Sequence, residues 1–178
     1  MQEIHPFVVP MFIADVKDWQ SKKQKLLALP DWDASDCMYE DNFTDYHKYK
    51  TKPPYMQKFL DIIETELKEF AQKIDHSIGI SALWAQRYKR NQYMGPHNHG
   101  PLGYSAILYA EFDAEVHNGT QFFGPYNNFL HGSTLEFTPE VQEGQILFFP
   151  STIFHHSLPS KGDKQRTIFS MNIKTQPS

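Results

Sequence analysis

With 178 residues, the chain is long enough to form one domain with a single sizeable core, and its hydrophobic (40%) and aromatic (15%) content is typical of a globular protein. The net charge of −4 gives no basic footprint, so we expect no nucleic-acid partner. The single cysteine, Cys37, excludes an internal disulfide and a zinc cluster made of cysteines. The chain shows no basic leader before a long apolar segment and no apolar run of membrane-spanning length, so we expect a soluble, cytoplasmic protein without a membrane partner.

The first eighty residues predict a strand, two helices and an irregular segment. The run Phe7–Ile13 is apolar but broken by proline, which favours an edge strand because proline cannot donate to a sheet ladder. Asp15–Leu29 predicts a short helix. Residues 30–54 have no clear periodicity and form an aromatic arm, for which we expect packing on the surface, with a lid or substrate wall as the alternative. Pro54–Ile74 carries apolar residues at steps of three and four, which predicts one continuous helix laid against a sheet.

Beyond Gly79, short apolar segments alternate with glycine, proline and asparagine. Many short strands separated by turn residues favour a β-sandwich or a barrel over alternating β/α units. No linker divides the chain, so we expect one domain, 1–178, with a strand and helix layer at 1–79 and a barrel core at 80–174. The predicted strands are Ile80–Lys89, Tyr104–Phe112, Gly119–Phe123, Thr134–Phe137, Gln145–Phe149 and Thr167–Ile173.

Two histidines placed two residues apart suggest half of a metal site. His97 and His99 lie between two Gly-Pro pairs, and residues i and i+2 of an extended segment point to the same side. Imidazole is a suitable ligand for iron, zinc, copper and nickel. An isolated His-x-His segment also fits a plain polar turn, so the metal hypothesis depends on a third ligand.

That third ligand can come from His155 or His156, which follow the apolar strand predicted at Gln145–Phe149. Adjacent residues of a strand point to opposite faces, so only one of the pair can join His97 and His99. Three ligands on one face of an octahedral ion leave three positions open, which is the arrangement of the non-haem iron oxygenases. The remaining histidines are expected at the surface: His5, His47, His76, His117 and His131.

Arg166, eleven residues after His155, is a candidate for binding an acidic co-substrate. A buried guanidinium can bind a carboxylate through two parallel hydrogen bonds. Taken alone, an arginine that follows the turn at 161–164 is expected in solvent, so this role depends on the neighbouring histidines.

The order and spacing of these motifs resemble those of the Fe(II)- and 2-oxoglutarate-dependent dioxygenases. The resemblance is closest to a small branch common in bacteria and tailed phages, which carries His-x-His-Pro, then Phe-Pro-Ser-x-x-x-His, then Arg-x-Ser-x-Ser-Phe-Asn. The corresponding segments here are His97–Gly100, Phe149–His155 and Arg166–Asn172. The likeness covers residues 84–173, which is about half of the chain.

The resemblance implies a mainly β fold, a double-stranded β-helix (jelly roll) with an N-terminal helical layer. It implies that His97, His99 and His155 are the catalytic ligands of Fe(II). It also implies that Arg166 binds the distal carboxylate of 2-oxoglutarate and that Tyr88 donates a hydrogen bond to the same carboxylate, since relatives often have a tyrosine at this position. Packing of Tyr88 in the barrel core is the alternative. The implied reaction consumes O₂, converts 2-oxoglutarate to succinate and CO₂, and oxidises, by hydroxylation, a substrate that remains unidentified. The implied location is the cytoplasm of the cell or of an infected host cell.

Departures from the pattern of the family include His99, Gly100 and Ile168. His99 replaces the carboxylate common in the wider family, so the ligand set would consist of three neutral imidazoles. Gly100 stands where the branch usually has proline. Ile168 stands where it has serine, which removes a hydroxyl that could assist Arg166.

Two other functions remain compatible with the sequence. A three-histidine dioxygenase of the cupin type would not use 2-oxoglutarate and would leave Arg166 without a role. A non-catalytic jelly-roll protein with a binding or structural role would hold no reactive iron. An HNH nuclease is excluded, because the histidines of such nucleases are far apart in their sequences and do not form a consecutive triplet like the one at 97–99.

The sequence leaves open whether the protein forms a homodimer. Candidates for the rim of a substrate pocket are Tyr39, Tyr46, Tyr93, Tyr104, Tyr126 and Asn127.

Overall fold

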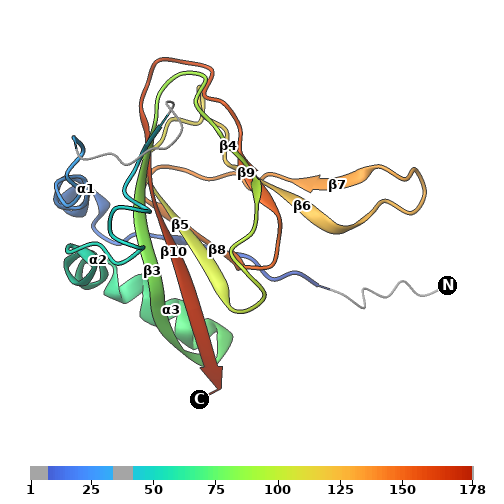
Figure 1. Ribbon diagram of the computed structural model, residues 1–178. Coiled ribbons are helices and arrows are strands. Elements are labelled where there is room, and N and C mark those ends of the chain that lie inside the picture. Colours follow the sequence, from blue (N-terminus) through green and yellow to red (C-terminus); the bar gives the residue numbers. More distant parts are fainter. Residues whose placement is uncertain (1–7, 34–41, 178) are drawn as a thin grey trace.

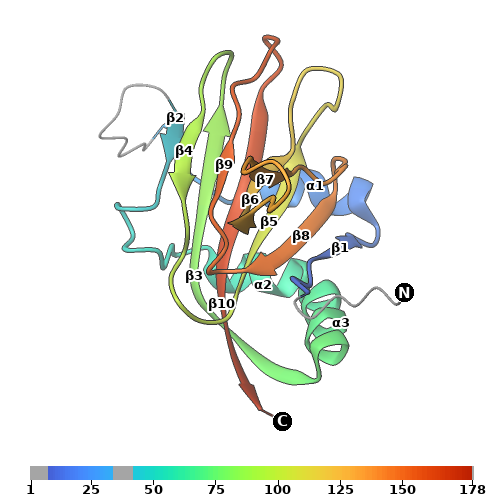
Figure 2. The ribbon, with the colours of Figure 1, turned by 90° about the vertical axis from the view of Figure 1, so that its right-hand side faces the viewer.

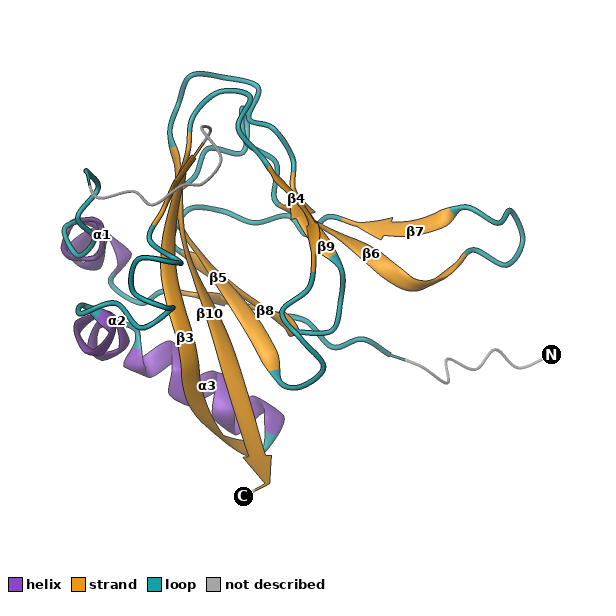
Figure 3. Ribbon diagram, in the orientation of Figure 1, coloured by secondary structure: helices purple, strands orange, loops and turns teal. Residues whose placement is uncertain are grey.

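The computed structural model describes residues 8–33 and 42–177, which form three layers (Figures 1 and 3). The outer layer contains the helices α1 (Trp19–Leu27), α2 (Met56–Ile62) and α3 (Glu64–Ile74). A six-stranded sheet forms the middle layer and a four-stranded sheet forms the third. None of the helices in the described ranges is long and apolar enough to cross a membrane.

The strands of the six-stranded sheet are β1 (Phe12–Asp15), β2 (Asn42–Thr44), β3 (His76–Tyr88), β5 (Tyr104–Glu111), β8 (Gln145–Pro150) and β10 (Arg166–Pro177). Those of the four-stranded sheet are β4 (Met94–His97), β6 (Thr120–Asn127), β7 (Thr134–Phe137) and β9 (His155–Ser157). The first sheet has the order β1-β8-β5-β10-β3-β2 and the second the order β4-β9-β6-β7. All pairings between these strands are antiparallel, and the smaller sheet lies on the side of the larger one away from the helices (Figure 2). This arrangement confirms the predicted jelly roll with an N-terminal helical layer.

The six-stranded sheet has a different core on each face, because side chains alternate along a strand. On β10, Phe169 and Met171 point toward the helices and pack in a core that includes Phe59 of α2. Ile168 points toward the smaller sheet and packs in a second core with Tyr109. The row of β10 on this inner side consists of Arg166, Ile168, Ser170 and Asn172. One strand therefore contributes both to the stability of the helical layer and to the space between the sheets.

The single helix predicted for Pro54–Ile74 is two helices, so this prediction is wrong in its continuity. Ile63 has φ −108° and ψ 18°, outside the helical region, and it separates α2 from α3. The apolar stripe nevertheless runs through the break, since Phe59, Ile63 and Leu67 are all buried. The periodicity of the sequence is unchanged at the break, and no glycine or proline marks it.

The predicted strands of the barrel are all present, and the errors concern short elements. The edge strand predicted at Phe7–Ile13 lies instead at Phe12–Asp15, still at the edge of its sheet, and the helix predicted from Asp15 begins at Trp19. β2, β4 and β9 were not predicted as separate strands; each has three or four residues. His155 thus opens a strand of its own after a turn, rather than ending the strand of Gln145–Pro150.

Replacing Phe59 by alanine should destabilise the protein by about 3–5 kcal/mol, because the cavity left by a fully buried aromatic ring is only partly refilled. Phe59 packs against Phe169 with ring centroids 4.9 Å apart. Chemical denaturation followed by circular dichroism measures the change. Phe129→Ala is the matched control, since Phe129 is 90% exposed and its removal should shift stability by no more than about 0.5 kcal/mol. Equal effects of the two variants would contradict the packing described above.

Candidate metal centre

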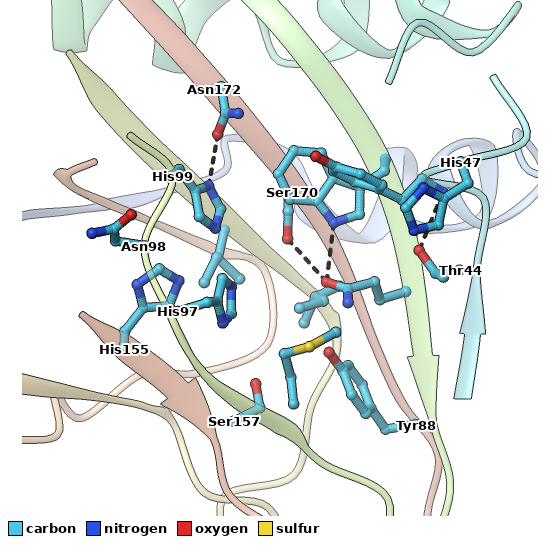
Figure 4. A pocket seen from close by; sticks show the side chains of 16 residues that line it. Thr44, His47, Tyr88, His97, Asn98, His99, His155, Ser157, Ser170 and Asn172 are labelled. Atoms are coloured by element: carbon cyan, nitrogen blue, oxygen red, sulfur yellow. Dashed lines mark hydrogen bonds between the residues drawn. The ribbon is translucent and has the colours of Figure 1, made fainter. Parts of the chain in front are cut away.

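Three histidines, two on neighbouring strands and one in the segment just after β4, meet at the inner side of the smaller sheet (Figure 4). His97 ends β4 and lies opposite His155, the first residue of β9, in the antiparallel register. His99 follows two residues after His97. The ring centroids are 4.4 Å apart for His97 and His155, 5.0 Å for His99 and His155, and 5.2 Å for His97 and His99. Each imidazole offers one nitrogen such that the three nitrogens lie within 4.8 Å of one another.

His156, the competing candidate, points to the opposite face of β9. Its Nε2 lies 2.6 Å from Oε1 of Gln121 on β6, and its ring packs against Phe123 at 5.0 Å. The alternation of side chains along the strand therefore brings His155, and not His156, to the other two histidines.

The hydrogen bonds of the three imidazoles determine which nitrogen is free. Nδ1 of His97 donates to the carbonyl oxygen of Gly95 (2.8 Å), and Nδ1 of His155 donates to that of Ile153 (3.0 Å). Nδ1 of His99 donates to Oδ1 of Asn172 (2.6 Å). A carbonyl oxygen can only accept, so each Nδ1 carries a proton, and in the neutral ring Nε2 then keeps its lone pair. This is the tautomer that a metal-binding histidine requires when its other nitrogen donates to an outer partner.

Burial favours the neutral form of two of these imidazoles, His99 and His155. Burial, together with the charges of the neighbouring histidines, lowers the pKa of His155 to about 3, against the opposing effect of the hydrogen bond to Ile153. It lowers the pKa of His99 to about 4, against the hydrogen bond to Asn172. Metal ions bind the neutral form of histidine, so the protonation state and the free Nε2 atoms both fit a divalent cation.

A cavity of about 420 Å³ opens beside the histidines. Figure 4 shows the three rings on one side of it, with Thr44 and His47 on the opposite side and Tyr88 and Ser157 at another end. None of the described side chains that line it is an aspartate, glutamate, lysine or arginine. The lining residues are Thr44, Tyr46, His47, Trp84, Gln86, Tyr88, Met94, His97, Asn98, His99, Ile107, His155, Ser157, Ile168, Ser170 and Asn172.

One polar group of this lining has a fixed orientation. Oε1 of Gln86 accepts from Nε1 of Trp84 (3.2 Å) and from the hydroxyl of Ser170 (3.4 Å). Since an indole nitrogen only donates, the oxygen of the amide must lie on that side. Nε2 of Gln86 then has no hydrogen-bond partner among the described residues, and it is available to a ligand in the cavity.

Arg166 is buried behind Tyr88, and its side chain is 1% exposed. The two residues are paired across β10 and β3, and the guanidinium carbon lies 4.3 Å from the centre of the Tyr88 ring. Nη1 donates to the carbonyl oxygen of Asn118 at 3.2 Å, whereas Nε and Nη2 have no partner in the described chain. Burial lowers the pKa of Arg166 from its ordinary value. Arg166 does not itself line the cavity, but Tyr88 does.

The aromatic arm at 30–54 contributes to the cavity wall, and its use is not confined to surface packing. Tyr46 and His47 line the cavity, and Tyr46 contacts the Trp84 ring edge-on at 5.1 Å. The buried carboxylate of Asp45 anchors this segment by accepting hydrogen bonds from the hydroxyl of Tyr55 (2.5 Å) and the backbone N–H of Ala85 (2.9 Å). The wall is thereby held against β3.

The other histidines and the candidate rim residues lie in different environments: some at the surface, some in the core and others in the lining of the cavity. His76 and His131 are exposed as expected, but His117 is buried: its Nδ1 accepts from the Asp113 N–H and its Nε2 donates to the carbonyl of Lys164. Among the rim candidates that the structure describes, only Tyr46 lines the cavity. Tyr104 packs instead in the core beneath the helices, while Tyr93, Tyr126 and Asn127 are exposed away from the lining. His5, Cys37 and Tyr39 lie outside the described residues.

The loop after His99 explains one departure from the motif of the family. Gly100 has φ 115°, a conformation that proline cannot adopt because its ring fixes φ near −65°. Gly103, with φ 80°, lies so close to β10 that an added Cβ would be 2.2 Å from the carbonyl oxygen of Ile173. The path from the histidines to β5 therefore depends on glycine at both positions.

The family described as "Putative 2OG-Fe(II) oxygenase" matches residues 82–172, just over half of the chain. The chain belongs to this family. The matched segment runs from β3 to Asn172 and includes the three histidines and Arg166. The protein is accordingly a 2-oxoglutarate-dependent oxygenase, an oxidoreductase that uses Fe(II), 2-oxoglutarate and O₂. No protein with a curated description matches it by sequence.

Solved structures of several such oxygenases are similar to this one. The viral collagen prolyl hydroxylase vCPH from Paramecium bursaria chlorella virus-1, in complex with 2-oxoglutarate, is 14% identical, with 93% of this chain and 96% of that chain covered and a TM-score of 0.62. A prolyl-4-hydroxylase from Pseudomonas putida is 12% identical (93% and 92% covered, TM-score 0.61). HygX from Streptomyces hygroscopicus, with nickel, 2-oxoglutarate and hygromycin B bound, is 9% identical (96% and 84% covered, TM-score 0.67). At these identities, the likeness shows a shared fold.

Sequence reasoning did not single out three residues that the structure connects to this centre. Gln86 and Ser105 had no signal beyond their places on predicted strands. Asn172 belongs to the last motif of the family, but only the pairing of β10 with β5 shows that it lies opposite Ser105 and close to His99.

His155→Ala should abolish binding of Fe(II) added anaerobically to the metal-free protein, because it removes one of three convergent nitrogens. His156→Ala is the matched control and should keep most of the affinity, since that side chain faces Gln121. Calorimetric titration measures both. Comparable losses in the two variants would refute the assignment of His155 as the ligand.

Proposed function

We propose that the protein is a hydroxylase in which Nε2 atoms of His97, His99 and His155 bind Fe(II) and Arg166 binds the distal carboxylate of 2-oxoglutarate. Support for the iron site comes from three imidazoles whose ligand nitrogens converge and whose Nδ1 atoms each have an acceptor partner. Three nitrogen ligands leave coordination positions for the oxo acid and for O₂. Iron, when bound, supplies the oxidative decarboxylation of 2-oxoglutarate to succinate and CO₂ that this family couples to substrate oxidation.

The observation that carries this proposal is the unpaired edge of Arg166. Nε and Nη2 are adjacent donors of the planar guanidinium, spaced to match the two oxygens of a carboxylate. Burying a cation with two unsatisfied hydrogen-bond donors raises the free energy of the folded protein, and a bound anion offsets this penalty by pairing with the charge and the donors. A three-histidine dioxygenase that works without 2-oxoglutarate would have no use for this group.

Tyr88 has two roles in this proposal. The tyrosine ring lies against the guanidinium and restricts its movement, and the attraction between a cation and an aromatic face adds to the contact. Tyr88 also lines the cavity, and in this proposal its hydroxyl donates to the same distal carboxylate as Arg166. Ile168, which replaces the serine of the family motif, provides an apolar wall beside it and no hydrogen bond.

The cavity favours an uncharged substrate group. Its described lining contains no aspartate, glutamate, lysine or arginine, and the rings of Tyr46, His47 and Trp84 form part of its wall. Nε2 of Gln86 offers a hydrogen bond to a neutral oxygen. Two of the similar structures are prolyl hydroxylases, and peptidyl proline is an uncharged ring followed by a carbonyl oxygen. We therefore name a prolyl peptide as the first candidate substrate. The test is whether adding the peptide raises the rate of succinate release above the rate measured without it.

Arg166→Met should weaken 2-oxoglutarate binding by roughly two to three orders of magnitude, since breaking a buried ion pair from one side costs about 3–5 kcal/mol. Affinity for Fe(II) should stay close to that of the wild type, because Arg166 is not a ligand. Anaerobic titration of the Fe(II) protein with 2-oxoglutarate, followed by the metal-to-ligand charge-transfer band, measures the first effect, and calorimetry measures the second.

Arg90→Met provides the control, because Arg90 is an exposed arginine that contacts Asp163 at the surface and lies outside the cavity. It should bind 2-oxoglutarate as the wild type does. The co-substrate assignment is wrong if the wild type develops no charge-transfer band, or if Arg166→Met binds 2-oxoglutarate as tightly as the wild type.

A further inference from the structure

His99 differs from the other two histidines in the partner of its Nδ1. His97 and His155 donate to backbone carbonyls within their own chain segments, two residues away. His99 donates to a side chain, Oδ1 of Asn172, seventy-three residues further along the chain on β10. The ligand that departs from the carboxylate of the wider family is thus the one whose orientation depends on another side chain.

Asn172 does not act alone, because a chain of buried hydroxyls holds its oxygen in place. The hydroxyl of Ser105 donates to Oδ1 of Asn172 (3.2 Å), lies 3.0 Å from Nδ1 of His99 and is 2.9 Å from the hydroxyl of Ser151. Ser105 and Ser151 are 0% and 2% exposed. The structure thus places the amide oxygen of Asn172, as an acceptor, between the hydroxyl of Ser105 and Nδ1 of His99.

The backbone of His99 is fixed by the same group of residues. Its N–H donates to the carbonyl oxygen of Ser151 (2.9 Å), and the N–H of Ser151 donates to that of Gly103 (3.0 Å). Main chain and side chain of His99 are therefore both anchored between β5, β10 and the turn that follows β8. Little freedom remains for the ring to rotate and present Nδ1 in place of Nε2.

We infer that Asn172, supported by Ser105, is a positioning residue that selects an imidazole at position 99 and directs its Nε2 toward the metal. The inference rests on the ligand role of His99 proposed above and deepens it. An acceptor oxygen at this place requires a donor opposite it, which the Nδ1–H of an imidazole provides. A carboxylate has no proton to donate at neutral pH and would place its lone pairs against those of Oδ1. The amide would have to reverse and give up the hydrogen bond from Ser105.

The tautomer of His99 in the metal-free protein tests the inference without any turnover. Nitrogen NMR of imidazole-labelled protein should show the proton on Nδ1 of His99 in the wild type. Asn172→Leu removes the acceptor and should give a mixture of tautomers. Asn172→Asp keeps an oxygen at the same place and should restore the Nδ1–H form. Wild-type protein with the proton on Nε2 of His99 would overturn the inference without recourse to any variant.

Metal affinity gives the second readout, with Co(II) alone as the probe. Loss of an outer partner of a metal-binding histidine typically costs roughly 10–100-fold in affinity, so we expect Asn172→Leu to bind Co(II) that much more weakly. Asn172→Asp should bind within a few-fold of the wild type, as should the exposed control Asn127→Leu. Asn172→Leu with wild-type affinity and an unchanged tautomer would overturn the inference.

The two readouts also separate this inference from the proposed function. If the wild type binds no Co(II) or Fe(II) while His99 still shows the Nδ1–H form that depends on Asn172, the ligand assignment fails and the hydrogen-bond network stands without its metal role. If the wild type binds metal and 2-oxoglutarate but the tautomer is independent of Asn172, the proposed function survives and the selection by Asn172 is wrong.

Discussion

The alternation of side chains along β10 is the constraint on which the rest of the structure depends. Phe169 and Met171 fix this strand against the helical layer. The alternate residues of the strand face inward, with Arg166 at one end of this row and Asn172 at the other. A shift of the register by one residue would move Arg166 and Asn172 to the face that packs against the helices. The same pairing that stabilises the core therefore sets the spacing between the co-substrate end of the cavity and the histidine end.

The electrostatics of the cavity follow from this arrangement. The imidazoles of His99 and His155 are held neutral by burial, so nothing in the cluster compensates the charge of a divalent metal. The guanidinium of Arg166 adds a second buried positive charge with two unused donors. A dianionic oxo acid supplies one carboxylate for each of these positions. His99 stands where the wider family has a carboxylate ligand, so this chain has no ligand charge to balance that of the metal. In the complex with metal and co-substrate, the anionic co-substrate is therefore more important for the charge balance.

The sequence was informative where a motif combines several residues, and less so where packing decides. The order of His97, His99, His155 and Arg166 predicted the family and the jelly roll, and alternation predicted that only one of the two adjacent histidines could join the cluster. The break at Ile63 was not predictable, because the apolar stripe continues through it. The short strands β2, β4 and β9 have too few residues to show a period. The hydrogen bond from His99 to Asn172 joins positions far apart in the chain and requires the sheet register.

A crystal structure of the anaerobic ternary complex shows most directly how iron and 2-oxoglutarate bind together. We expect the Nε2 atoms of His97, His99 and His155 to coordinate the metal. We expect the distal carboxylate of 2-oxoglutarate to lie on Nε and Nη2 of Arg166, with Oδ1 of Asn172 still bonded to Nδ1 of His99. Coordination through Nδ1, a metal bound without His99, or a distal carboxylate held away from Arg166 would contradict the proposed site.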